Sequence, residues 1–201
     1  MQTGPRHPGH SVLQVAVPAL EEFVRGRYAH YDPAYVSTDP AFSHAHVTVL
    51  GPFVDDPTPA DLAAVAQIAA GTEPFGFVLD DLHAFADGLV HLRPEPAAPF
   101  DALTARVHAA FPDHPPYAGR FEVVVAHLTL DVVSAEAGVS VTSTRAALGP
   151  VLPARCRAER LDLAWYEPGG SRLLASWPLG GGVTHPGRGR QDGSGAGGLV
   201  P

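Results

Sequence analysis

The sequence predicts an α+β fold made of two similar lobes, and two observations lead to this prediction. Strand-like alternation and helix-like periodicity are mixed along the chain, and the expected order of elements is β-α-β-α-β-β-α-β-α-β-β. The second part of this order loosely repeats the first, since each part has a helix, a loop, a strand with a His-x-Thr pattern, another helix and a strand pair. We therefore expect antiparallel or mixed sheets with flanking helices.

The first part of the chain contains two strands, each followed by a helix. A strand is expected over residues 11–17, and Pro18 then opens a helix, because proline is favoured at the first helical position. A second strand is expected over residues 44–50. Thr58 is the expected N-cap of the helix that follows this strand.

The first part ends with a hairpin of two strands over residues 75–81 and 89–93, because Asp87-Gly88 between them is a strong turn signal. The remaining elements are expected to be a helix with the apolar stripe Phe100, Leu103, Val107 and Phe111, a long strand over 122–133, a short helix near 141–148, and two strands over about 155–166 and 172–178.

Both ends of the chain differ in composition from the part between them. Residues 1–10 are rich in Pro, Gly and His, and residues 181–201 are dominated by Gly, so neither segment can bury a core. We expect both segments to be disordered. Residues 11–180 then form one two-lobed domain.

The charge of the chain limits the partners that it can bind. The formal net charge is -8, and all 13 basic residues are arginine. An acidic chain has no broad attraction for a phosphate backbone, which argues against a long nucleic-acid footprint. A small nucleotide or an RNA end, held by a few arginines, is the expected partner.

Other classes of protein are excluded by single features. Cys156 is the only cysteine, so the chain has no internal disulfide and no cysteine-based zinc site. No apolar run reaches the ~20 residues of a membrane span, and the first ten residues lack the pattern of a signal peptide. We therefore expect a cytoplasmic protein without membrane contact. No coiled-coil pattern is present, and a monomer is expected.

Two tripeptides with the same pattern fall in expected strands, His46-Val47-Thr48 and His127-Leu128-Thr129. On a strand, residues i and i+2 point to the same face, so each strand presents an imidazole beside a hydroxyl. With an apolar residue after each His and each Thr, two chance matches in this chain have a probability below about one per cent.

These side chains fit the chemistry of phosphoester cleavage. The reaction needs a base for the attacking oxygen and an acid for the leaving oxygen, and imidazole can do either near neutral pH. The threonine hydroxyls can donate hydrogen bonds to non-bridging phosphate oxygens. This scheme requires neither a metal nor a cofactor.

The paired motifs make the sequence similar to the 2H phosphoesterase superfamily, and more narrowly to the 2′-5′ RNA ligase family, also called RNA 2′,3′-cyclic phosphodiesterases. The matching residues are His46-Val47-Thr48-Val49 with Leu50-Gly51-Pro52-Phe53, and His127-Leu128-Thr129-Leu130 after Pro116-Tyr117. The resemblance covers about residues 11–180. Ala126 is a departure, because many relatives have proline there.

The resemblance implies two pseudo-symmetric lobes around a central cleft that carries both motifs. It implies that His46 and His127 are the general acid and base, in an order left open, and that Thr48 and Thr129 bind phosphate. The implied reaction is hydrolysis of a 2′,3′-cyclic phosphate or a 2′-5′ linked nucleotide, or ligation of RNA ends by the same chemistry in reverse.

Three further residues near the motifs are candidates for substrate binding. Tyr117 and Arg120 lie in the loop before the second motif, where they can stack on a base or reach a phosphate, although a packed Tyr and a solvated Arg are the commoner cases. Phe53, just after the first motif, fits stacking and core packing about equally well. Arg93 and Arg172 are further candidates, with no sequence pattern around them to support a role.

Two other functions are compatible with the sequence. One is a nucleotide- or phosphate-binding module without turnover, although binding alone does not need two titratable groups. The other is a metal-dependent hydrolase that uses His44, His46 and His127, since His44 shares a strand face with His46; otherwise His44 is expected at the cleft margin. The natural substrate has no legible signal in the sequence.

Overall fold

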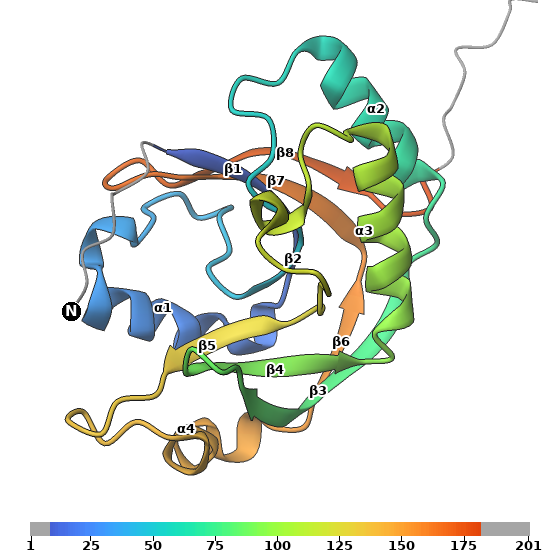
Figure 1. Cartoon of the computed structure of the whole chain (residues 1–201). Coiled ribbons are helices and arrows are strands. Elements are labelled where there is room, and N and C mark those ends of the chain that lie inside the picture. Colours follow the sequence, from blue (N-terminus) through green and yellow to red (C-terminus); the bar gives the residue numbers. More distant parts are fainter. Residues whose placement is uncertain (1–8, 182–201) are drawn as a thin grey trace, which may run out of the picture.

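The computed structural model describes residues 9–181, and its helices and strands alternate along the chain much as expected (Figure 1). The strands are β1 (His10–Ala16), β2 (His46–Leu50), β3 (Phe75–Ala84), β4 (Leu89–Glu95), β5 (Leu128–Val132), β6 (Ala154–Ala158), β7 (Arg160–Tyr166) and β8 (Arg172–Pro178). The helices are α1 (Glu21–Tyr31), α2 (Pro59–Ala70), α3 (Ala98–Ala110) and α4 (Val141–Leu148).

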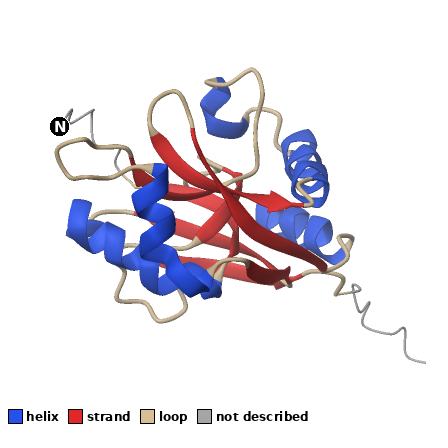
Figure 2. Cartoon of the chain, turned by 90° about the horizontal axis from the view of Figure 1, so that it is seen from below, coloured by secondary structure: helices blue, strands red, loops and turns tan. Residues whose placement is uncertain are grey.

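The eight strands form two antiparallel sheets of four strands each. One sheet has the order β2-β1-β7-β8, and the other has the order β5-β4-β3-β6. Figure 2 shows helices on both sides of the strands. The α+β fold class with two sheet-based lobes is therefore confirmed, and all of the strand pairs are antiparallel.

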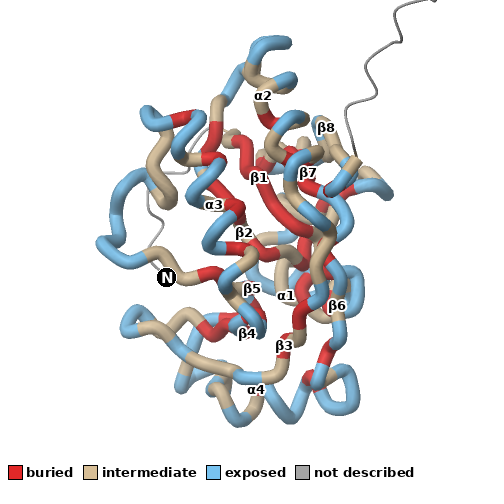
Figure 3. Tube along the Cα trace, turned by 90° about the vertical axis from the view of Figure 1, so that its right-hand side faces the viewer, coloured by how far each residue is buried: buried red, intermediate tan, exposed pale blue. Residues whose placement is uncertain are grey.

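One face of each sheet contributes to a shared hydrophobic core. Figure 3 shows the buried parts of the strands in red. In β2 the core residues are Val47 and Val49, and in β5 they are Leu128 and Leu130. Helix α3 packs against β2 from the core side, with Phe100 fully buried. Because side chains alternate along a strand, the residues between these apolar ones point to the opposite face.

The two sheets meet at β2 and β5, which are edge strands of their own sheets and lie next to each other (Figure 1). His46 is the first residue of β2, and His127 directly precedes β5. The fold therefore brings together two motifs that are far apart in the sequence.

The single strand expected over residues 155–166 is wrong, because this stretch forms two strands in different sheets. β6 pairs with β3, whereas β7 pairs with β1 and β8. The break falls at Glu159-Arg160, two consecutive exposed charged residues between the buried Ala158 and Leu161. Two exposed residues in a row interrupt the period of two that one continuous strand requires.

The long strand expected over residues 122–133 is also wrong, since only Leu128–Val132 forms β5. The partner strand explains the difference. Leu128 pairs with Leu92, so continuing the same register would place residues 126 and 124 opposite Pro94 and Pro96. Proline has no N–H to donate, so the ladder cannot extend in that direction. His127 consequently lies just before the strand.

The ends of the chain were expected to be disordered over residues 1–10 and 181–201, and residues 1–8 and 182–201 of these lie outside the described range. His10 begins β1, one residue before the expected start of that strand. No helix within residues 9–181 is long and apolar enough to cross a membrane.

Candidate active site

The ring of His46 is fixed from behind by its own strand and by β7. Its Nδ1 lies 2.8 Å from the carbonyl oxygen of His44, which can only accept, so Nδ1 carries the ring proton. The hydroxyl of Tyr166 lies 3.1 Å from the same nitrogen and donates to Oε1 of Gln14 at 2.7 Å. Nε2 of the neutral His46 ring is therefore the free acceptor.

His127 is held in the same way in the second lobe. Its Nδ1 lies 2.7 Å from the carbonyl oxygen of Val125, again two residues earlier in the chain. Phe85 and His91 pack against the imidazole with ring centroids 5.0 and 5.4 Å away. The two histidines thus share one tautomer, with Nδ1 as donor to the backbone and with no hydrogen bond to Nε2 within residues 9–181.

Tyr117 links the two motifs. Its ring stacks on His127 with centroids 5.9 Å apart, and it lines the same cavity as Thr48 of the first motif. Its backbone N–H donates to the carbonyl oxygen of Gly51 at 2.8 Å, just after β2. Tyr117 and Ala118 both have positive φ, 53° and 54°, a strained conformation that is concentrated at functional sites in proteins.

The pKa values of both motif histidines are below the ordinary value. Burial, the largest cause, acts with the charge of His127 to lower the pKa of His46 to about 4, and together they outweigh the hydrogen bond to the His44 carbonyl, which raises it. Burial also lowers the pKa of His127, with a smaller contribution from the charge of Arg93. Both rings are therefore neutral at pH 7 without substrate.

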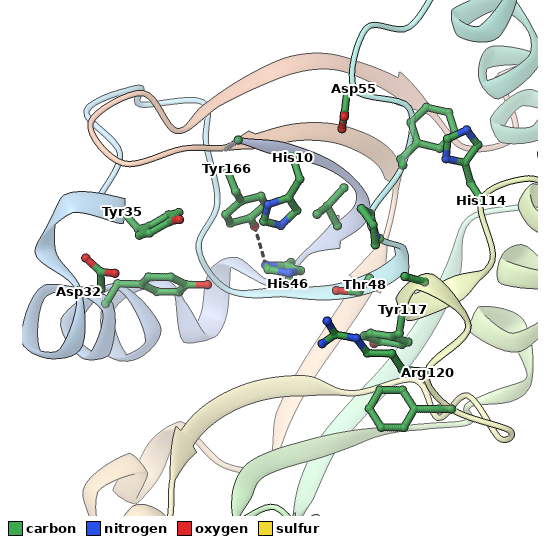
Figure 4. A pocket seen from close by; sticks show the side chains of 18 residues that line it. His10, Asp32, Tyr35, His46, Thr48, Asp55, His114, Tyr117, Arg120 and Tyr166 are labelled. Atoms are coloured by element: carbon green, nitrogen blue, oxygen red, sulfur yellow. Dashed lines mark hydrogen bonds between the residues drawn. The ribbon is translucent and has the colours of Figure 1, made fainter. Parts of the chain in front are cut away.

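A cavity of about 870 Å³ opens beside the first motif (Figure 4). His46 and Thr48 lie on its wall, with Tyr166 and Tyr35 on one side and Tyr117 and Arg120 on the other. The lining includes neither His127 nor Thr129, but Tyr117 on the cavity wall contacts the His127 ring. Thr129 is exposed on β5.

The three candidate substrate-binding residues have different environments. Arg120 lines the cavity and forms no ion pair within residues 9–181, so its charge is available to a ligand. Tyr117 lies between the motifs. Phe53 reaches the cavity wall but is only 2% exposed and packs edge-on against Phe111 at 4.8 Å, so it is placed as a core residue.

His44 does not lie at the cleft margin, where it was expected, but is 3% exposed behind the site. Its Nδ1 donates to Glu21 Oε1 at 2.6 Å, and its Nε2 accepts from the backbone N–H of Ser37 at 3.1 Å. Both ring nitrogens are used, so His44 cannot ligate a metal together with His46 as this structure stands. No group of three suitable side chains within residues 9–181 could hold a metal ion.

Several residues that support the site carry no sequence signal of their own. Gln14 and Tyr166 come behind His46 only through the pairing of β1 with β2 and β7, and Glu21 at the start of α1 is hydrogen-bonded to His44 and Ala45. His91 could have been singled out only with the β4–β5 register in hand, which pairs it with Thr129.

A fold of two antiparallel sheets, with a His-x-Thr motif at each of the adjoining edge strands, defines a two-lobed protein of the 2H phosphoesterase superfamily. The sequence also matches the family model described as the 2'-5' RNA ligase superfamily over residues 15–170. This match spans more than half of the chain, so the protein belongs to the 2′-5′ RNA ligase superfamily.

Solved structures of this fold are similar over most of their length. E. coli LigT complexed with 3'-AMP is 19% identical, with a TM-score of 0.53 over 86% of this chain and 99% of that chain. LigT complexed with NADP+ is 18% identical, with a TM-score of 0.52 over 86% of this chain and 98% of that chain. TT0787 of Thermus thermophilus is 18% identical, with a TM-score of 0.54 over 86% and 98%. At these identities the likeness shows the fold alone. No curated protein sequence matches the chain.

Proposed function

We propose that the protein hydrolyses a 2′,3′-cyclic phosphate or a 2′-5′ linkage at the end of a nucleotide or RNA, by acid–base catalysis with two histidines and without a metal. One observation carries this proposal. His46 begins β2 and His127 directly precedes β5, two strands that lie side by side, and both rings are held in the same tautomer by equivalent carbonyl hydrogen bonds. His91 makes the same kind of bond, but its Nε2 accepts from Arg93, whereas Nε2 of both motif histidines has no hydrogen-bond partner within residues 9–181.

The reaction follows from these positions. For a cyclic phosphate, one neutral imidazole takes a proton from water while the water oxygen bonds to phosphorus. The bond from phosphorus to one ribose oxygen breaks, and the other histidine, protonated, gives its proton to that oxygen. A bound phosphate anion raises the pKa of a neighbouring histidine, which supplies the protonated form that the acid requires.

The threonines and Arg120 supply the hydrogen bonds that hold the phosphate. Thr48 and Thr129 would donate hydroxyl hydrogen bonds to its non-bridging oxygens, and the Arg120 guanidinium would neutralise part of its charge. The small nucleotides named for the LigT structures, 3'-AMP and NADP+, support a nucleotide ligand for this cleft as well. The same steps in reverse would join RNA ends.

The proposal is tested with nucleoside 2′,3′-cyclic phosphates and 2′-5′ dinucleotides, and with product identification. His46→Ala and His127→Ala should each lower kcat by about 10² to 10⁴, because each removes one acid–base group. His30→Ala, on the exposed face of α1, is the matched control and should leave turnover unchanged. Activity should also survive EDTA.

Three outcomes would contradict the proposal. Turnover that is unchanged in His127→Ala would exclude the second motif from catalysis. Loss of turnover with EDTA, restored by an added divalent cation, would favour a metal-dependent hydrolase. Nucleotide binding without any product would favour a binding module that has no turnover.

A further inference from the structure

The exposed face of the second sheet continues beyond His127 onto β4, where Arg93 occupies the next position. His91 pairs with Thr129 and Leu92 with Leu128, so the same register places Arg93 opposite His127. Side chains at positions 91 and 93 share a strand face, which is the face that carries the second motif. Arg93 therefore stands on the side of His127 that is away from β2 and His46.

Arg93 is held in place by a buried neutral residue. Its Nε lies 3.4 Å from Nε2 of His91, which is 0% exposed. His91 Nδ1 donates to the carbonyl oxygen of Leu89 at 3.2 Å, so Nε2 is the ring acceptor. The ring also stacks on Phe85 with centroids 3.8 Å apart. His91 can thus orient the guanidinium without neutralising it.

The charge of Arg93 has no protein counterion. The side chain is exposed, and none of the ion pairs among residues 9–181 includes it. An arginine that is oriented from behind, exposed in front and unpaired is suited to bind an anion, because the guanidinium can donate two hydrogen bonds to one phosphate group.

We propose that Arg93 binds a second phosphate group of the substrate, next to the phosphate that His46 and His127 bracket. This inference rests on the proposed function and specifies its substrate class. The favoured substrate is an oligonucleotide end that carries a neighbouring phosphodiester, and a nucleoside cyclic phosphate with one phosphate is a poorer substrate. Arg93 would bind only one neighbouring phosphate. This is compatible with the net charge of -8, which argues against a long nucleic-acid footprint.

The activity test compares cytidine 2′,3′-cyclic phosphate with a cytidine dinucleotide that ends in the same cyclic phosphate. The wild-type protein should prefer the dinucleotide in kcat/KM by roughly 10- to 100-fold, the range of one charged hydrogen-bonded contact. Arg93→Ala should remove most of this preference, and Arg93→Lys should restore part of it.

Arg155→Ala is the matched control. Arg155 and Glu95 both pair with Val78, which places Arg155 on the same sheet face, two strands farther from the cleft. It is exposed like Arg93, and its replacement makes the same change in charge. The preference should be unchanged in Arg155→Ala. An equal preference in wild type and Arg93→Ala, or an equal loss in both variants, would overturn the assignment.

A binding measurement separates this inference from the proposed function. Calorimetry with inorganic phosphate and pyrophosphate needs no turnover, and wild type should bind pyrophosphate more tightly, with the difference lost in Arg93→Ala. If His127→Ala abolishes hydrolysis while Arg93→Ala changes neither preference nor pyrophosphate binding, Arg93 is excluded and the proposed function stands. If no substrate is hydrolysed but the pyrophosphate difference depends on Arg93, the proposed function is wrong and Arg93 is still a phosphate-binding residue.

Discussion

At the scale of single residues, the site depends on backbone carbonyl groups that select one tautomer of each histidine. A carbonyl oxygen can only accept, so the residues two positions before His46 and His127 fix where each ring carries its proton. Burial then keeps both rings neutral near pH 7. The neutral form is the one that can act as a base.

The lowered pKa of His46 predicts a pH dependence of stability. His46 has a pKa of about 4 in the folded protein, against 6.5 for an ordinary histidine. Between these values the unfolded chain binds more protons, so the free energy of unfolding falls as the pH falls from about 6.5 toward 4. From pH 7 to pH 5 this residue alone should cost about 2 kcal/mol.

Urea unfolding of wild type and His46→Asn at both pH values measures this contribution, because the difference between the two proteins isolates residue 46. The variant should lose less stability than wild type on acidification. His30→Asn, on the exposed face of α1, should follow wild type. Parallel pH profiles for wild type and His46→Asn would show that His46 titrates normally in the folded state.

The sequence was sufficient to find the pair of motifs, but not the residues that support them. The i and i+2 rule on a strand predicts that His46 faces the same way as Thr48 without any tertiary information. Tyr166 and Gln14 reach His46 only through strand pairing between distant segments. His44 lies on the strand side expected to face the cleft but is enclosed by neighbouring elements, which no local pattern could reveal.

At the scale of secondary-structure elements, Glu21 joins the start of α1 to β2. Its Oε2 accepts from the backbone N–H of Ala45 at 2.9 Å, and its Oε1 accepts from His44. Burial acts to raise the pKa of Glu21, but the hydrogen bonds from His44 and from the Ala45 and His44 amides outweigh it and lower the pKa to about 2. The contribution of this carboxylate to stability is therefore complete above about pH 4.5 and is lost as the pH falls through 2.

Replacing this carboxylate should weaken the attachment of the helix to the strand. Glu21→Gln keeps one acceptor but loses the charge, and we expect it to lower the free energy of unfolding at pH 7 by about 1–3 kcal/mol. Glu22→Gln, at the exposed neighbouring position, is the control and should change it by less than about 0.5 kcal/mol. Equal urea midpoints for the two variants would show that the Glu21 contacts contribute nothing.

Most elements followed from local patterns, and the two errors arose where a partner strand decides the outcome. Residues 122–133 look like one strand, but β4 offers prolines where the extension would need N–H donors. Residues 155–166 look like one strand as well, but Glu159 and Arg160 end one ladder and start another. Pairing between strands is a long-range property that a single segment does not encode.

At the scale of the whole molecule, the first sheet is made from both ends of the described chain. β1 lies between β2 and β7, so strands from the start and the end of the fold are neighbours. The second sheet comes entirely from the part between them. The first sheet therefore needs strands from both halves of the sequence.

This arrangement predicts the effect of truncation. A chain that ends at Glu159 lacks β7 and β8, which leaves β1 unpaired on one side and exposes buried core residues such as Leu13. We expect such a chain to show no cooperative thermal transition by circular dichroism. A chain that ends at Gly181 keeps every described strand and should unfold like the full chain. A cooperative transition in the shorter chain would show that the first sheet does not need its last two strands.

The strand break at Glu159 has a mechanical consequence as well. β6 ends at Ala158 and β7 begins at Arg160, so a single residue carries the chain around the corner from one sheet to the other. A link of one residue leaves little freedom in how the ends of the two sheets are placed. Glu159 therefore helps to fix the relative position of the lobes that carry His46 and His127.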